Sequence, residues 1–311
     1  MKINFTNLYK LTPDKKAIFK KINNLIKNNK FIGGDEVKKF EMEFSKFTNS
    51  KYCVSVANGT DALFLSLKAL QLKKGSEAIV PVNTWISTAE AVVESGLKLI
   101  FCDVDLNDYS MDLKDLKKKI TKNTKLIIPV HLYGNPTNVI AIKKIVKKKN
   151  IKIIEDCAQA HGSTIKRKHV GTFGNIGTYS FFPGKNLGCF GDGGAIITNN
   201  KKYYEFILRA RNHGALNKYD HKFSGQNSRL DTIQAAILRI KLKNYKKVIA
   251  KRNLLAELYH KNLQKNKNIK LFNLNESYIS CYHQFVIRTN KRNNLQKFLN
   301  TKNIPTMIHY P

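Results

Sequence analysis

YCVSVANGTDALFLSLKAL (Tyr52 to Leu70) holds the repeating unit from which the fold follows. Its first residues form a mostly apolar run, typical of a strand that is buried on both faces, whereas Gly59 to Leu70 has the spacing of a helix. The same order continues along the chain, and we predict further strands in EAIVPV (77–82), KLIFCDVD (98–105), KLIIPVHL (125–132), IKIIED (151–156), GTYSFF (177–182) and GGAIIT (193–198). This alternation predicts an α/β fold whose large domain has a mostly parallel sheet covered by helices on both faces.

Helices are predicted between and around these strands. Thr12 and Pro13 suit an N-cap and a first helical residue, and they open a predicted helix that ends near Asn28. The other predicted helices cover 37–47, 85–95, 113–120, 139–149 and 203–211, then a long helix after Asp231 and a short one near 295–300, with one more strand near 282–288. We expect a large domain over residues 1–240 and a smaller C-terminal α/β domain over 241–311. The small domain looks incomplete, because a single strand–helix unit before Pro311 leaves a sheet edge open.

The composition of the 311 residues excludes several classes of protein. A hydrophobic fraction of 42% with 25% charged residues is typical of a soluble globular protein, and no apolar run approaches the roughly 18–20 residues of a membrane span. The first residues, MKINFTNLYK, lack the apolar core of a signal peptide. The five cysteines are scattered without a CxxC pair, which favours reduced thiols and no metal site. We therefore expect a cytoplasmic protein without a membrane partner.

The strong positive charge raises the question of nucleic-acid binding. Lys and Arg number 55 against 22 Asp and Glu, a net charge of +33. Only 8 of the 55 are arginine, the residue preferred for bidentate contacts to bases and phosphates. The lysines alternate with apolar positions, as in KKAIFKKINNLIKNNK, which is the usual pattern of a solvated helix surface. We interpret the lysines as solvated faces and expect no nucleic-acid partner.

Polar residues follow several predicted strands, at the sheet edge where α/β proteins bind their ligands. Gly59 and Thr60 open a helix, whose free N–H groups and positive dipole end suit a phosphate, although a plain turn capped by Asn58 is the alternative. Asp156 closes an apolar strand, where a carboxylate needs a partner. That partner is either a protonated ring nitrogen of a ligand or one of the many lysines.

The stretch SFFPGKNLGCFGDGGA (180–195) contains the most unusual lysine of the chain. Lys185 follows two phenylalanines and a proline, and an amine in an apolar pocket has a lowered pKa that makes it a nucleophile and base. The alternative is a lysine that extends to solvent. Ser180 offers a hydroxyl for a phosphate. Trp85, the single tryptophan, either stacks on a flat ring or packs in the core.

Together these residues meet the needs of one cofactor. Pyridoxal 5'-phosphate requires a lysine for a Schiff base, an acid on the pyridinium nitrogen, a phosphate site and packing against its ring. The order of these residues along alternating strands and helices is compatible with one shared cleft. The sequence therefore predicts a pyridoxal-phosphate enzyme.

The sequence also resembles the DegT/StrS family of sugar aminotransferases, which are pyridoxal-phosphate enzymes of the aspartate-aminotransferase fold. The resemblance runs from FIGGDEVKKFE to the end of the chain, and it is carried by ANGTDAL, VPVNTWISTAEAV, PVHLYGNP, EDCAQAHG, SFFPGKNLGCFGDGGA and GQNSRLDTIQAAIL. Family members usually continue some tens of residues past the HYP segment. Those residues complete the small domain, which is the departure of this chain from the family pattern.

The resemblance implies a role for each matching residue. Lys185 would form the Schiff base and move protons, and Asp156 would pair with the pyridine nitrogen. The remaining assignments are Gln159 to the ring hydroxyl, Gly59, Thr60 and Ser180 to the phosphate, Trp85 to the ring face, Asn227 to the phosphate of the neighbouring subunit's cofactor, and His309 to the substrate. The role of Asn227 implies a homodimer.

The resemblance further implies a reaction. An amino acid, commonly glutamate, would donate an amino group to a keto-sugar nucleotide in polysaccharide biosynthesis. A sugar dehydratase branch of the family has His where the Schiff-base lysine normally stands, whereas this chain has Lys185. The remaining alternative is a catalytically silent homologue or fragment.

Overall fold

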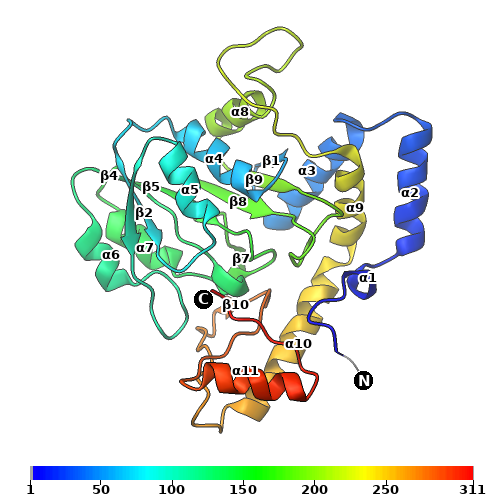
Figure 1. The fold of residues 1–311 in the computed structure, drawn as a ribbon. Coiled ribbons are helices and arrows are strands. Elements are labelled where there is room, and N and C mark those ends of the chain that lie inside the picture. Colours follow the sequence, from blue (N-terminus) through cyan, green and yellow to red (C-terminus); the bar gives the residue numbers. More distant parts are fainter. Residues whose placement is uncertain (1–2, 311) are drawn as a thin grey trace.

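A computed structural model describes residues 3–310, and its centre is a seven-stranded sheet in the order β1-β9-β8-β5-β4-β2-β3 (Figure 1). Its strands are β1 (Tyr52–Val56), β2 (Glu77–Pro81), β3 (Lys98–Cys102), β4 (Thr124–Ile127), β5 (Lys152–Asp156), β8 (Ile176–Ser180) and β9 (Gly194–Thr198). Strand β9 is antiparallel to both of its neighbours, and all the other neighbouring pairs are parallel. The predicted, mostly parallel sheet is therefore confirmed.

Helices lie around this sheet, and the last two lie below it in the view of Figure 1. They are α1 (Leu8–Leu11), α2 (Lys15–Lys27), α3 (Gly34–Thr48), α4 (Gly59–Leu70), α5 (Ser87–Glu94), α6 (Leu113–Lys119), the 3-10 turn η1 (Leu132–Gly134), α7 (Val139–Val146), α8 (Lys201–Ala210), α9 (Thr232–Lys243), α10 (Tyr245–Leu263) and α11 (Arg292–Thr301). Asparagine or aspartate side chains cap the first amides of α4, α6, α7 and α8. Such caps satisfy N–H groups that have no partner inside a helix. Within residues 3–310, no helix has the length and apolar character needed to span a bilayer.

Consecutive residues of the strands point into different cores, because side chains alternate across a sheet. Ile196 of β9 lies in the cluster that includes residues of α4, α5 and α8, whereas Ile197 lies in the cluster formed with α3 and α9. In β5, Ile154 belongs to the first cluster, while Ile153 packs with α6 and α7. Both faces of the sheet are therefore covered, as the near-continuous apolar strands predicted.

The first predicted helix begins later than expected. Asp14, not Thr12, is its N-cap, and the Asp14 carboxylate accepts a hydrogen bond from the Ala17 amide at 3.1 Å. Thr12 instead ends the short helix α1, where its hydroxyl donates to the Leu8 carbonyl at 2.8 Å. A carboxylate is a strong capping group, and this explains the shifted boundary.

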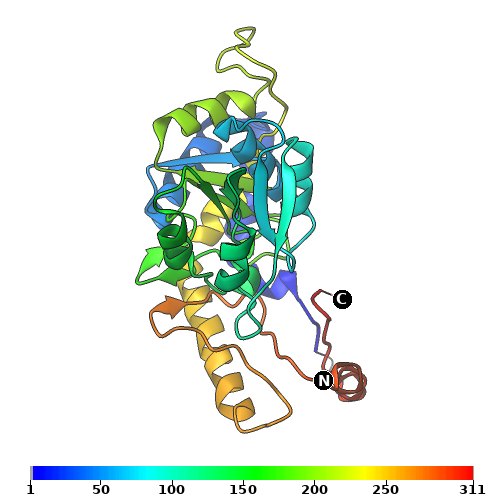
Figure 2. The ribbon, with the colours of Figure 1, turned by 90° about the vertical axis from the view of Figure 1, so that its left-hand side faces the viewer.

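The region after the sheet differs most from the sequence prediction. The predicted long helix is two helices, α9 and α10, which are interrupted at Asn244. The strand predicted over 282–288 is wrong, since the segment makes only an isolated bridge between Lys270 and Arg288 and has no neighbouring strand for a ladder. A short strand β10 (Tyr278–Ile279) pairs instead with β6 (Thr164–Ile165), which also pairs with β7 (Lys168–His169). In both views α10, β10 and α11 lie below the large sheet (Figures 1 and 2).

Candidate active site

The start of α4 and the end of β8 form a small polar cradle. A Cβ built on Gly59 would lie 2.6 Å from the Ser180 Cβ, so the two residues are in direct contact. The Asn58 side chain caps the Asp61 amide at 2.8 Å, while the backbone amides of Gly59 and Thr60 donate no hydrogen bond to another described residue. Two free N–H groups at a helix N-terminus beside a serine hydroxyl suit a phosphate. The capped turn and the phosphate site are thus compatible with each other.

Thr60 joins this cradle to the next helix. Its hydroxyl donates to the Ser87 Oγ at 2.9 Å, which links the first turn of α4 to the first turn of α5. Thr60 therefore keeps oxygen lone pairs free while its proton is used within the protein.

Asp156 lies at the carboxyl end of β5 and is only 5% exposed. Its Oδ2 accepts a hydrogen bond from the Thr88 hydroxyl at 2.9 Å, and its Oδ1 accepts one from the Ala158 amide at 3.0 Å. It makes no ion pair with a lysine among residues 3–310, so the simple salt-bridge alternative is wrong. A buried carboxylate held by neutral donors is a suitable partner for a cation that a ligand brings.

Lys185 lies in the loop that follows β8 and is half-buried. Its backbone amide donates to the Phe182 carbonyl at 2.8 Å. Burial lowers the pKa of the Lys185 amine below its ordinary value, and the negative charge of Asp156 opposes this shift. The amine is therefore near enough to Asp156 to feel its charge, and it has more of the reactive neutral form than a surface lysine.

Gln159 and the chain end approach the same edge of the sheet. The Gln159 Oε1 accepts the Tyr133 amide at 2.7 Å, and its Nε2 donates to the Tyr310 hydroxyl at 3.1 Å. The Tyr133 hydroxyl donates to the His309 carbonyl at 2.5 Å. Burial, followed by the charge of Lys185, lowers the pKa of His309. The structure thus brings Gln159 and His309 into the neighbourhood of Lys185.

Trp85 lies on the solvent-exposed side of the candidate site residues. It is 59% exposed, and its ring centroid lies 6.2 Å from that of Tyr310. The alternative of core packing for Trp85 is therefore wrong. An exposed indole beside the site is free to cover a flat ligand.

Asn227 forms no hydrogen bond with the other predicted site residues, and its loop makes an isolated bridge to Asn212. It lines a separate cavity of about 380 Å³ together with Ala57, Asp192 and Arg229. The hydroxyl of Ser228, the next residue, accepts the Ala57 amide at 3.2 Å, so this loop reaches the turn before α4. Within one chain, Asn227 therefore lies near the turn before α4, in a cavity that it shares with Ala57.

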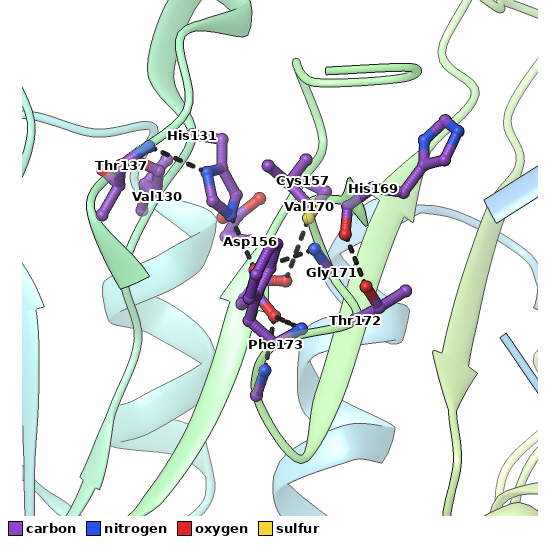
Figure 3. Close-up of polar contacts among 12 residues, drawn as sticks. Val130, His131, Thr137, Asp156, Cys157, His169, Val170, Gly171, Thr172 and Phe173 are labelled. Atoms are coloured by element: carbon purple, nitrogen blue, oxygen red, sulfur yellow. Dashed lines mark hydrogen bonds and ion pairs between the residues drawn. The ribbon is translucent and has the colours of Figure 1, made fainter. Parts of the chain in front are cut away.

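A buried network of hydrogen bonds surrounds Glu155, the residue that precedes Asp156 in β5 (Figure 3). The carboxylate of Glu155 accepts the amides of Gly171, Phe173 and Gly174 at 2.8, 2.7 and 2.6 Å. The His131 Nδ1 accepts the Thr137 amide at 3.0 Å, so its Nε2 carries the proton and donates to Glu155 at 3.1 Å.

Cys157 lies within 4.8 Å of these ligand atoms, a spacing that metal sites also have. Burial raises the pKa of the Cys157 thiol well above its ordinary value, so the thiol stays protonated. Since the His131 nitrogens are already engaged, the group suits structural support of β5 better than metal binding.

Several residues at this edge were not singled out from the sequence. Thr88 orients Asp156, and Tyr133 and Tyr310 hold Gln159 and His309. Thr88 and Tyr133 stand in the motifs VPVNTWISTAEAV and PVHLYGNP, and Tyr310 directly follows His309. Proximity to a strand end was therefore an available signal, but the contacts between distant segments were not.

The site fits a phosphorylated pyridine cofactor by its own chemistry. It offers free helix amides next to Ser180, a buried carboxylate that has no ion-pair partner among residues 3–310, and an amine of lowered pKa. A Cβ on Gly194 would lie 2.2 Å from the Asn58 carbonyl oxygen, so only glycine permits the backbone to pass behind the cradle.

Known proteins are similar to this chain in both amino-acid sequence and fold. A model described as "DegT/DnrJ/EryC1/StrS aminotransferase family" matches residues 13–311. A "dTDP-3-amino-3,6-dideoxy-alpha-D-galactopyranose transaminase" of Aneurinibacillus thermoaerophilus is 42% identical over 296 residues, which are 95% of this chain and 81% of the relative. The crystal structure of DesV from S. venezuelae "in complex with ketimine intermediate" superimposes with a TM-score of 0.96 at 34% identity, covering 100% of this chain and 84% of that one.

A further structure, "ntda from bacillus subtilis with bound cofactor pmp", has a TM-score of 0.93 at 31% identity and covers 100% of this chain and 72% of that one. The expectations of an aminotransferase and of pyridoxal phosphate as its cofactor are confirmed at the level of the family. Because the family match extends over nearly the whole sequence and the fold agrees, this chain belongs to the DegT/DnrJ/EryC1/StrS aminotransferase family.

Proposed function

We propose that this protein transfers an amino group from an amino acid, glutamate in the first instance, to a keto-sugar nucleotide, through a Schiff base between Lys185 and pyridoxal phosphate. The observation that carries the proposal is the pair formed by the buried Asp156 carboxylate and the half-buried Lys185 amine, whose pKa responds to the charge of Asp156. The bound cofactor supplies an electron sink for the carbon that loses or gains a proton.

The side chains of this protein would divide the remaining tasks. Asp156, held by the Thr88 hydroxyl at 2.9 Å, would keep a proton on the ring nitrogen. Lys185, whose pKa is lowered by burial, would accept a proton from the donor and return it to the sugar carbon. The free amides of Gly59 and Thr60 with the Ser180 hydroxyl would hold the phosphate. Gln159 would contact the ring hydroxyl.

The proposed substrate is supported by the similarity to a named relative. The relative from A. thermoaerophilus is called a transaminase of a dTDP-linked 3-amino sugar. We therefore propose a nucleotide-linked hexose with a ketone at C3 or C4 as the acceptor, with the C3 ketone as the first compound to test. His309 and the exposed Trp85 would contact it.

The test is a panel of dTDP-, UDP- and GDP-linked 3-keto and 4-keto sugars with glutamate. Transfer replaces the keto oxygen by an amine while glutamate becomes 2-oxoglutarate, and mass spectrometry follows both products. A visible absorbance band that changes when glutamate is added supports the first half-reaction independently of the sugar. A protein that binds no cofactor and transfers nothing would be a silent homologue. Loss of a sugar hydroxyl without amination would instead indicate a dehydratase.

The proposal also includes the oligomeric state of the protein and its domain boundaries. We propose a cytoplasmic homodimer in which Asn227 reaches the cofactor phosphate of the partner subunit. The position of Asn227 in a loop that lines an open cavity next to the turn before α4 supports a role across an interface. Residues 1–240 would form the cofactor domain and residues 241–311 part of a smaller one.

A further inference from the structure

The loop that carries Lys185 is tied to a segment almost one hundred positions later by a single side chain. The Asn186 Nδ2 donates to the carbonyl of Cys281, 95 positions later in the sequence, at 2.9 Å. The Asn186 Oδ1 lies 3.1 Å from the His283 Nδ1. Since the amide group of Asn186 already donates to Cys281, its oxygen is the acceptor and the His283 Nδ1 carries the proton. Asn186 therefore forms hydrogen bonds with both the backbone and a side chain of the 281–283 segment.

The His283 end of this tie is firmly held. The Arg252 Nη1 of α10 donates to the Tyr282 carbonyl at 2.7 Å and to the His283 carbonyl at 3.4 Å. A Cβ on Gly134 would lie 2.8 Å from the His283 amide nitrogen, so the backbone on the other side is in contact as well. His283 thus has little freedom to follow the Lys185 loop if that loop moves.

The loop around Lys185 is also held by α9, where the Lys241 amine donates to the Gly188 carbonyl. The Lys185 amide bonds to Phe182 within the same loop, and the buried Leu187 follows at 0% exposure. None of these contacts involves residues 281–283. Among the hydrogen bonds of residues 3–310, those of the Asn186 side chain are the ones that link this loop to residues 281–283.

The ionisable groups that face Lys185 come from several elements. They are Asp156 at the end of β5, His161 after β5, His283 in the segment after β10, and His309 near the chain end. Burial lowers the pKa of all three histidines, and the charge of Lys185 adds to this. Around neutral pH, His283 is therefore the neutral imidazole that the hydrogen bond to Asn186 requires.

We propose that Asn186 and His283 are a positioning pair that fixes the Lys185 amine relative to Asp156 and so makes the lysine competent for proton transfer. The proposal rests on the proposed function, because it assigns Lys185 the reactive role. A displacement of about 1 Å in a reacting group lowers rates by about 100-fold, so the residue next to Lys185, which is bound at two points of another segment, matters for turnover.

Four variants test the pair. Asn186→Ala and His283→Leu remove the tie, while His283→Asn keeps an N–H donor near the position of Nδ1. Asn253→Leu is the matched control, since the Asn253 Nδ2 joins α10 to the Ser280 carbonyl at 3.0 Å in the same segment without touching the lysine loop. The holoenzymes are compared by kcat, by KM and by the pH midpoint of their visible absorbance.

The expected result separates positioning from stability. Asn186→Ala and His283→Leu should lower kcat by about 10- to 100-fold with a small change in KM, and shift the absorbance midpoint by about one pH unit. His283→Asn and Asn253→Leu should stay near wild type. Equal effects of Asn253→Leu and Asn186→Ala would overturn the proposal, because the segment would then act only as a structural anchor.

A second readout works without any cofactor. Competitive acetylation of lysines in the full chain, followed by peptide mapping, gives the pH dependence of Lys185 itself. Release of the loop exposes the amine to water, so in Asn186→Ala its pKa should rise toward that of an ordinary lysine. An unchanged Lys185 profile in Asn186→Ala would refute the positioning pair. A wild-type protein without an absorbance band would contradict the proposed function alone.

Discussion

Gly59 and Ser180 touch so closely that a Cβ on residue 59 would lie 2.6 Å from the Ser180 Cβ and 3.3 Å from its Cα. The first belongs to the first turn of α4, and the second ends β8. The distance between a helix N-terminus and a strand end therefore depends on the absence of a methyl group. The two backbones can converge on one small anion because nothing separates them.

Gly59→Ala should weaken both the protein and its phosphate site. Because the Cβ meets backbone-near atoms of Ser180, α4 has to shift, and we expect a loss of about 1–3 kcal/mol in the free energy of unfolding. Urea denaturation measures it, and absorbance titration with pyridoxal phosphate measures the affinity. Gly184→Ala is the control, since its Cβ would meet only the Phe182 ring at 3.5 Å. Similar stability losses in both variants would argue against the contact.

Lys185→Ala should abolish transamination while the fold persists. The Lys185 side chain is half-buried and is not a member of the hydrophobic clusters, so its truncation leaves the core intact. We expect a fall in kcat by orders of magnitude with a far-ultraviolet circular dichroism spectrum like that of wild type. Borohydride reduction of the wild-type holoenzyme followed by peptide mapping should label Lys185. A label on another lysine would refute its role.

Asp156→Asn should retain the structure and lose most of the activity. The Asn oxygen can still accept the Thr88 hydroxyl, which now donates to Oδ2 at 2.9 Å, but a neutral amide cannot stabilise a protonated ring nitrogen. We expect turnover close to that of Asp156→Ala. Steady-state kinetics with glutamate provide the measurement, and near-normal turnover of the Asn variant would contradict the role.

His161 should make the protein sensitive to acid. Its ring is completely buried, neither ring nitrogen has a hydrogen-bond partner among the described residues, and burial followed by the charge of Lys185 lowers its pKa to about 3. The unfolded chain, with a value near 6.5, binds the proton first. The stability is therefore fully present above that value and is lost as the pH falls from there toward 3.

His161→Leu tests this effect. At a pH of about 5 this one group should cost the wild type about 2 kcal/mol relative to neutral pH, a loss that the variant lacks. Urea denaturation of both proteins at the two pH values gives the difference, and contributions of the other histidines cancel. Parallel pH dependences in the two proteins would show that His161 does not titrate in this way.

Asn227→Ala should weaken cofactor binding without unfolding the chain, because Asn227 lies in a loop that lines an open cavity. If each site uses Asn227 of the partner subunit, mixing Asn227→Ala chains with Lys185→Ala chains should restore one intact site per heterodimer. Activity of the mixture against that of each variant alone provides the measurement. A chain that sediments as a monomer yet binds the cofactor tightly would exclude this arrangement.

The sheet could be predicted from sequence because its strands are apolar on both faces. Ile153 and Ile154, or Ile196 and Ile197, belong to opposite cores, and such adjacent apolar residues have no place in a half-exposed strand. The strand predicted over 282–288 failed for the complementary reason. Its apolar residues resemble a strand, but a strand also needs a neighbour, and the single bridge at Arg288 shows that none is in place.

The location of a candidate site residue was predictable from sequence where the residue stands at the end of a strand or at the start of a helix. Asp156, Ser180 and Gly59 stand directly at strand or helix ends, so their convergence follows from the topology. Contacts such as Asn186 with His283 join segments far apart in the chain. No local pattern encodes them, because they depend on where the last segments return.

The reversed strand β9 has a consequence for the order of folding. Within the seven-stranded sheet β1 pairs only with β9, with Val56 opposite Gly194, and β9 then pairs with β8. During synthesis, the apolar β1 therefore remains without its partner until the ribosome has completed residue 198, while β2, β3 and β4 can already assemble. Such a long-range closure slows folding, and an unpaired early strand invites chaperone binding on the nascent chain.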